Sequence, residues 1–165
     1  MDLKTLKSFF SKLPQVEASA NELQFVNTRI QWKGLVGASR SLSATALAEQ
    51  APGHHLFVLN DKEEAAYFLN DLEGLYPEDK RVLFYPASYR VPYQIEETDN
   101  ANVVSRAEVL EKINGGKNVW VVTYPEALFE KVPTQKKLSD NTLRIEVGKT
   151  YSIDFINELL LEYHF

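Results

Sequence analysis

The chain has 165 residues, of which 44% are hydrophobic, and this is enough for one compact domain and part of a second. Its formal net charge of −5 gives no general attraction toward nucleic acid, so the composition disfavours a DNA-binding module acting alone. The absence of cysteine excludes disulfides, thiolate metal sites and cysteine nucleophiles. No stretch approaches the roughly 18 apolar residues of a membrane span, and the N-terminus lacks a secretory signal. The sequence therefore predicts a cytoplasmic protein with no membrane partner.

The first third of the chain reads as helix, connector, strand and helix. Residues 2–13 carry an apolar stripe at helical spacing, and Asp2 is expected to cap this helix. Pro14 is expected to end it, and residues 15–28 are interpreted as a connector. A first strand is predicted over residues 29–32, followed by a glycine-containing loop and a helix that runs to residue 50.

The middle of the chain alternates strands with helices. The apolar run over residues 56–59 is typical of a strand buried on both faces, and Asp61 is expected to cap the next helix. The remaining predicted elements are a helix to residue 75, a strand over 81–85, an irregular segment over 86–100, a helix over 101–114, a strand over 119–122 and a short helix from Pro125. This alternation predicts an α/β fold of three layers, with a mainly parallel sheet and helices on both faces.

The last thirty residues read as a linker and the beginning of a second domain. Residues 134–141 are polar, residues 143–147 alternate as a half-exposed strand does, and Ser152 is expected to cap a final amphipathic helix. The apolar face of that helix is expected to fold back on the domain or to pack against another copy. Because the chain ends directly after this helix, we expect it to be a fragment of a longer protein.

The segment from Gly34 to Ser41 lies where a strand is expected to pass through a glycine turn into a helix. Phosphate-binding loops share this plan and follow the motif G-x-x-x-x-G-K-[ST]. Gly34 takes the first glycine position and Ser41 the hydroxyl position, but Ser39 and Arg40 replace the second glycine and the lysine, and Gly37 is an additional small residue. Two interpretations stay open: a turn that lets a helix pack closely on a sheet, and a degenerate loop with residual anion binding.

The sequence contains little evidence for a catalytic site or a metal site elsewhere in the chain. An ATPase needs a pair of carboxylates at a strand end, and neither Asp61 nor the residues that follow Thr123 provide one, so no hydrolysis and no catalytic residue are predicted. His54 and His55 are adjacent and point to opposite faces of a strand, and His164 lies at the end of the chain, so surface positions are expected rather than a metal site.

An aromatic segment with one arginine follows the strand over residues 81–85. Tyr89, Arg90 and Tyr93 are candidates for contact with nucleic acid or a partner, because aromatic faces stack on bases; the alternative is a loop packed on the sheet edge. The acidic residues 96–99 weigh against DNA. Arg106 near a helix start opposes the helix dipole, so a structural ion pair with a carboxylate is expected there.

Five runs of sequence, in this order, resemble the N-terminal part of bacterial transcription-repair coupling factors (the Mfd family). The resemblance covers residues 25–165, and the last run is similar to the start of the second domain in that family. The runs are GLVGASRSLSATALAEQ, HLFVLNDKEEAAYFLNDLEGLYP, VLFYPASYRVPY, SRAEVLEKINGGKNVWVVTYPEAL and RIEVGKTYSIDFINELLLEYHF.

This resemblance implies three segments: an N-terminal helix and connector over residues 1–24, a RecA-like domain over 25–136 similar to domain 1a of UvrB, and the truncated start of an α+β domain over 137–165. In the family, the full protein displaces stalled RNA polymerase with an ATP- and Mg-dependent DNA translocase and recruits excision repair through UvrA. The resemblance implies that those motor domains, and most of the UvrA-binding domain, lie beyond this chain. For this chain the resemblance implies a recognition scaffold without cofactor and with weak or absent DNA contact.

Three hypotheses therefore stand. The first is the non-catalytic scaffold, which contacts excision-repair proteins and other domains of its own parent. The second is a nucleotide-binding domain in which Gly34, Gly37, Arg40 and Ser41 surround phosphate. The third is an unrelated small α/β enzyme whose site residues the sequence does not reveal.

Overall fold

The computed structural model describes residues 2–77, 79–89, 99–134, 136, 148–150, 152–154 and 156–157. The chain divides into two compact units, Met1–Val132 and Pro133–Phe165. Residues 1–24, expected to form a separate N-terminal segment, belong to the first unit. The strand expected over residues 143–147 and most of the last helix lie outside the described residues.

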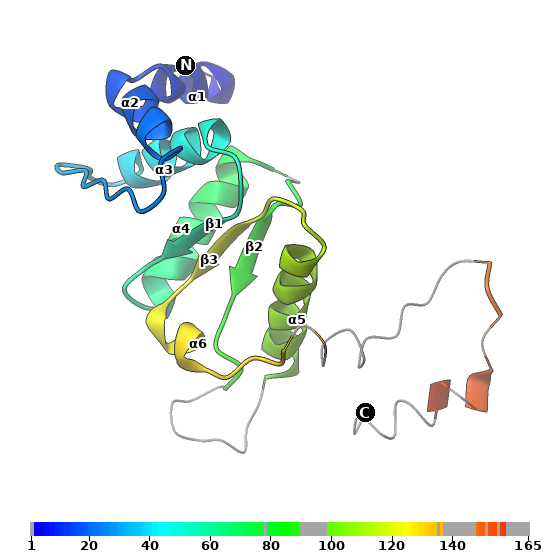
Figure 1. The fold of residues 1–165 in the computed structure, drawn as a ribbon. Coiled ribbons are helices and arrows are strands. Elements are labelled where there is room, and N and C mark those ends of the chain that lie inside the picture. Colours follow the sequence, from blue (N-terminus) through cyan, green and yellow to red (C-terminus); the bar gives the residue numbers. More distant parts are fainter. Residues whose placement is uncertain are drawn as a thin grey trace. The chain divides into compact units, whose positions relative to one another are not determined.

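The first unit is a mixed α/β structure built on a small parallel sheet (Figure 1). Its elements, in chain order, are α1 (Leu3–Ser11), α2 (Pro14–Glu22), α3 (Ser39–Gln50), β1 (His55–Val58), α4 (Lys62–Leu75), β2 (Val82–Tyr85), α5 (Asn100–Asn114), β3 (Trp120–Thr123) and α6 (Pro125–Phe129). None of the helices in the described ranges is long and apolar enough to cross a membrane.

Aspartate side chains begin three of these helices, because a carboxylate satisfies amides that have no partner inside the helix. Asp2 accepts from the Thr5 amide at 2.8 Å and Asp61 from the Glu64 amide at 2.7 Å, which confirms both predicted caps. The hydrogen bond to Thr5 lowers the pKa of Asp2 below its usual range. Asp99 caps α5 in the same way.

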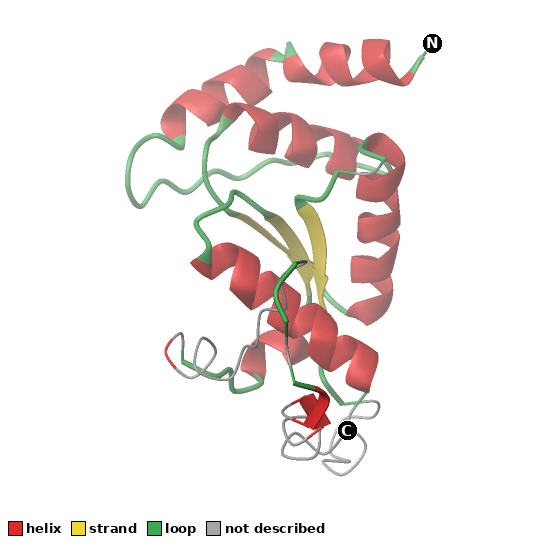
Figure 2. Cartoon of the chain, turned by 90° about the vertical axis from the view of Figure 1, so that its right-hand side faces the viewer, coloured by secondary structure: helices red, strands yellow, loops and turns green. Residues whose placement is uncertain are grey.

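The sheet has the strand order β1-β3-β2, and both pairs are parallel. The middle strand β3 is buried along its whole length. Helix α4 covers one face, where the Phe57 ring lies 5.2 Å from Phe68 and the Tyr76 ring 5.0 Å from Trp120. Helix α5 covers the other face, and the sheet lies between the two helices in both views (Figures 1 and 2).

Three predicted features are wrong. Residues 14–22 form helix α2, because Pro14 occupies a first-turn position, where a missing N–H costs nothing, and Val16 is buried. Residues 29–32 belong to a segment that pairs with no described strand. The run over residues 56–59 is not buried on both faces: β1 is an edge strand whose Leu56 and Val58 are 55% and 49% exposed.

Candidate functional site at the Gly34–Ser41 loop

The loop before α3 has the backbone turn that its glycines predicted. Gly34 and Gly37 have φ angles of +81° and +52°, in the left-handed region that residues with a Cβ rarely adopt. Helix α3 begins at Ser39, directly after the turn. The chain therefore has a glycine turn that opens a helix, and its capacity for phosphate depends on where the loop amides point.

Hydrogen bonds inside the turn already engage three amides of the loop. The Ser39 amide donates to the Val36 carbonyl and the Arg40 amide to the Gly37 carbonyl, both at 3.2 Å. The Ser39 hydroxyl accepts from the Val36 amide at 2.8 Å and donates to the Val36 carbonyl at 2.7 Å. A bound phosphate would have to break these contacts before it could use the three N–H groups.

The last two residues of the motif segment, Arg40 and Ser41, contact carboxylates of α4. The buried Ser41 hydroxyl donates to Asp71 Oδ2 at 2.7 Å, and Arg40 Nη2 lies 3.7 Å from Glu64 Oε2. In a working loop the hydroxyl would bind Mg²⁺ and the cation would reach phosphate. Here both side chains face anionic groups of the chain itself. Sequence reasoning missed Glu64 and Asp71, although their spacing of seven places them on one face of a helix.

A small cavity lies beside this loop. Its volume is about 210 Å³, which is below the roughly 300–1,000 Å³ typical of small-molecule sites. The lining side chains include one arginine and two carboxylates, so their formal charge is −1. This combination of size and charge is unfavourable for a nucleoside triphosphate. The lining residues are Gly37, Arg40, Leu59, Glu64, Tyr67, Phe68 and Asp71.

The residues that follow β1 and end β3 do not provide the pair of carboxylates that an ATPase needs. Asp61, after β1, caps α4 through the Glu64 amide, as predicted. Thr123, at the end of β3, donates its hydroxyl to the Tyr85 carbonyl at 2.8 Å. Among the described residues, no group of three or more histidine, aspartate or glutamate side chains is placed to hold a metal ion.

The two histidines in the described part of the chain, His54 and His55, lie in different surroundings. His54 is exposed, while His55 is partly buried with Nε2 2.8 Å from the Ala51 carbonyl and its ring edge-to-face with Trp120. His164 lies outside the described residues. His55 is thus explained by local packing and a backbone contact.

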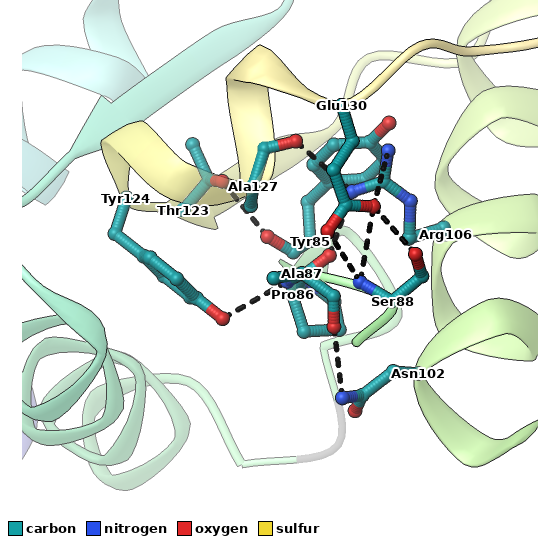
Figure 3. A network of polar contacts seen from close by, with 10 residues as sticks. All are labelled: Tyr85, Pro86, Ala87, Ser88, Asn102, Arg106, Thr123, Tyr124, Ala127 and Glu130. Carbon is teal, nitrogen blue, oxygen red and sulfur yellow. Dashed lines mark hydrogen bonds and ion pairs between the residues drawn. The ribbon is translucent and has the colours of Figure 1, made fainter. Parts of the chain in front are cut away.

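Arg106 belongs to a polar network at the ends of strands β2 and β3 (Figure 3). Arg106 Nη1 donates to the carbonyls of Pro86 and Ala127 at 2.8 and 3.0 Å, and Nη2 lies 3.4 Å from Glu130 Oε2. Its guanidinium also stacks 4.2 Å over the Tyr85 ring. The predicted structural ion pair is confirmed, and its partner comes from the end of α6.

The same network fixes the segment that follows β2. Ser88 donates from both its amide and its hydroxyl to Glu130, the hydroxyl at 2.6 Å. The Ala87 amide donates to the Tyr124 hydroxyl and the Ala87 carbonyl accepts from Asn102, both at 2.9 Å. Burial raises the pKa of the Tyr124 hydroxyl, so it stays neutral in this role. Figure 3 shows these groups converging on residues 86–88.

The aromatic candidates do not form a described site. Tyr89 follows the anchored segment and is 36% exposed, and Arg90 and Tyr93 lie outside the described residues. Every buried side-chain nitrogen and oxygen in the described ranges has a hydrogen-bond partner. The network is therefore a structural anchor for this loop, and none of its buried polar atoms is left to receive a ligand.

Comparisons of this chain with protein-family models, with curated proteins and with solved structures found no match.

Proposed function

We propose that this chain is a non-catalytic recognition scaffold, the N-terminal part of a transcription-repair coupling factor. In this proposal a RecA-like fold with a phosphate-loop plan serves to organise contacts with excision-repair proteins and with other domains of its parent. The parent displaces stalled RNA polymerase through ATP-driven domains elsewhere and recruits UvrA. The chain itself makes little or no contact with DNA.

The observation that supports the non-catalytic part of the proposal is the occupied loop. The amides of Val36, Ser39 and Arg40 are bonded within the turn, and the Ser41 hydroxyl donates to Asp71. Three of the loop amides and the Ser41 hydroxyl thus have partners within the chain. The repair role is supported by the ordered sequence resemblance.

The test is repair of the transcribed strand in the source cells. Deletion of the gene is expected to abolish the preferential repair of that strand. Arg40→Ala in the full-length parent is expected to leave it unchanged, because Arg40 forms an ion pair with Glu64 and in this proposal holds no nucleotide. Unchanged repair after the deletion would contradict the role in repair. Loss of repair in a stable Arg40→Ala protein would contradict the non-catalytic assignment.

A second candidate, residual nucleotide binding, is favoured by one feature: Arg40 is half-exposed at a cavity that Gly37 also lines. Calorimetry with ATP and ADP, with and without Mg²⁺, separates the two. The scaffold proposal expects no binding tighter than about 100 μM, or about −5.5 kcal/mol. Tighter binding that disappears in Arg40→Ala would favour the second candidate.

A further inference from the structure

Helix α1 lies on the surface of the first unit and has no buried residue. Leu6 and Phe10 pack partly buried against the core, whereas Phe9 is 61% exposed. The helix has nine residues, and isolated helices shorter than roughly 12–15 residues are marginal in water. The contacts that α1 makes with the rest of the unit therefore decide whether it is folded.

A cavity of about 460 Å³ lies between α1 and the residues beneath it. Packed protein interiors contain few voids larger than a water molecule, and side chains beside a void lose dispersion contacts. The polar residues of α1 that line this cavity recur at spacings of three and four, so it is the polar face of the helix that borders the void. That face contributes little burial energy. The lining residues are Leu3, Lys4, Lys7, Ser8 and Ser11 of α1, together with Glu49, Leu75 and Pro77.

The Lys7 ammonium ties this face to the end of α4. Its Nζ donates to the Leu75 carbonyl at 3.3 Å and lies 3.5 Å from the centre of the Tyr76 ring. Leu75 is the last residue of α4, where the negative end of the helix dipole favours a cation, and the face of an aromatic ring does the same. A second attachment lies near the other end of α1, where Gln50 Nε2 donates to the Ser11 carbonyl at 2.9 Å.

The junction between α1 and α2 lets α1 separate without unfolding its neighbour. Pro14 is the first residue of α2 and has no N–H, and Leu13 before it is extended, with φ −65° and ψ 129°. No continuous helical ladder therefore crosses the junction. Val16 of α2 is only 1% exposed, and Ser19 accepts from the Trp32 indole at 2.9 Å. Helix α2 thus keeps its own attachments when α1 leaves.

We propose that α1 is a strap that opens and closes as one unit while the parallel sheet stays folded, and that the Lys7 ammonium holds it closed. In the open state α1 loses its helical hydrogen bonds. Opening also uncovers the Tyr76 ring face and the Leu75 carbonyl, the two groups that hold the ammonium in the closed state. This inference goes beyond the proposed function and does not depend on it.

The test is amide hydrogen exchange of the 165-residue chain, followed by NMR at several urea concentrations below the unfolding transition. The amides of Leu6, Phe9 and Phe10 are expected to share one opening equilibrium with a weak dependence on urea, because a small surface is exposed. The amides of the buried strand β3 report global unfolding. We expect the α1 amides to exchange at least about 100-fold faster than these, and still slower than an unfolded peptide.

Three variants test the role of Lys7 and of the cavity. Lys7→Gln removes the charge with little change in helix propensity, and it is expected to speed exchange of the α1 amides about tenfold. Lys4→Gln is the matched control, because Lys4 is exposed on the same helix and lines the same cavity, and it is expected to change exchange less than about twofold. Ser11→Leu places apolar volume in the cavity and is expected to slow exchange about threefold.

The proposal is overturned if the α1 amides exchange as slowly as those of β3 with the same urea dependence, because α1 would then unfold only with the whole unit. Exchange at the rate of an unfolded peptide would show that the strap is not closed. Exchange that slows steadily from one end of α1 to the other would show fraying in place of one opening. Equal acceleration by Lys7→Gln and Lys4→Gln would refute the role of the ammonium, and no slowing in Ser11→Leu would refute the role of the cavity.

Discussion

Replacement of Arg106 by methionine removes the centre of the polar network at the end of the sheet. The side chains of Arg106 and Glu130 are 8% and 15% exposed, so this ion pair is shielded from water. Methionine keeps most of the apolar volume but removes two hydrogen bonds to carbonyls and leaves the Glu130 carboxylate without its cation. Loss of one partner from a buried pair costs about 3–5 kcal/mol.

We expect the lower end of that range, about 3 kcal/mol of unfolding free energy, because the hydrogen bonds from Ser88 still solvate the carboxylate. For a chain of this size, the loss corresponds to a fall of about 9 °C in the thermal midpoint. Urea unfolding followed by tryptophan fluorescence measures it, because Trp120 is buried in the same sheet. A loss below about 1 kcal/mol would refute the reasoning.

The matched control is Arg81→Met. Arg81 also pairs with a carboxylate, Asp79, at 2.7 Å, but its side chain is 44% exposed. Exposed pairs contribute about 0–1 kcal/mol, so this variant is expected to lose much less stability than Arg106→Met. Combining Arg106→Met with Glu130→Gln removes the unpaired charge and is expected to cost less than the sum of the two single changes.

Three further predictions concern acidity and helix capping. The hydrogen bond from Arg81 holds the pKa of Asp79 below its usual range. The Arg81–Asp79 pair therefore stabilises the fold at pH values above the usual aspartate pKa, and this stabilisation is lost as the pH falls through the lowered pKa. In urea titrations, Asp79→Asn is therefore expected to be less stable than the parent at about pH 7, and this deficit is expected to shrink as the pH falls through the lowered pKa of Asp79; a deficit that does not change with pH would contradict this. Burial raises the pKa of Tyr76 to about 12, so the parent is expected to lose stability between about pH 10 and 12, and Tyr76→Phe to lose less over that interval; parallel curves would count against it. Asp61→Ala removes the acceptor of the Glu64 amide and is expected to lower the unfolding free energy by about 1 kcal/mol, with Asp61→Asn as the retaining control; equal losses in both variants would disprove the capping role.

Local signals in the sequence predicted much of the fold. The caps at Asp2 and Asp61 and the helix period of residues 101–114 depend on neighbours a few positions away, and the structure has all three. The exposure of Leu56 could not be predicted, because an apolar run has the same appearance in an edge strand and in a central one. Its position at the edge depends on β3, which enters the sheet between β1 and β2.

The candidate site was predicted in outline. The glycine turn and the start of α3 follow from Gly34, Gly37 and the helical residues after them. The bond from Ser41 to Asp71 spans thirty residues, and that from Ser88 to Glu130 spans forty-two, so no local pattern indicates either one. The Ser41–Asp71 contact occupies the hydroxyl that an anion-binding loop would use, and the Ser88–Glu130 contact anchors the segment after β2.

The most direct test of the central claim, that three amides of the loop are closed to phosphate, is a titration of ¹⁵N-labelled chain with ATP and Mg²⁺, observed at the amides of Val36, Ser39 and Arg40. The account predicts that these resonances stay unchanged up to about 1 mM nucleotide, a concentration that would saturate a site with a dissociation constant of about 100 μM. Saturable shifts at these amides that disappear in Arg40→Ala would contradict it.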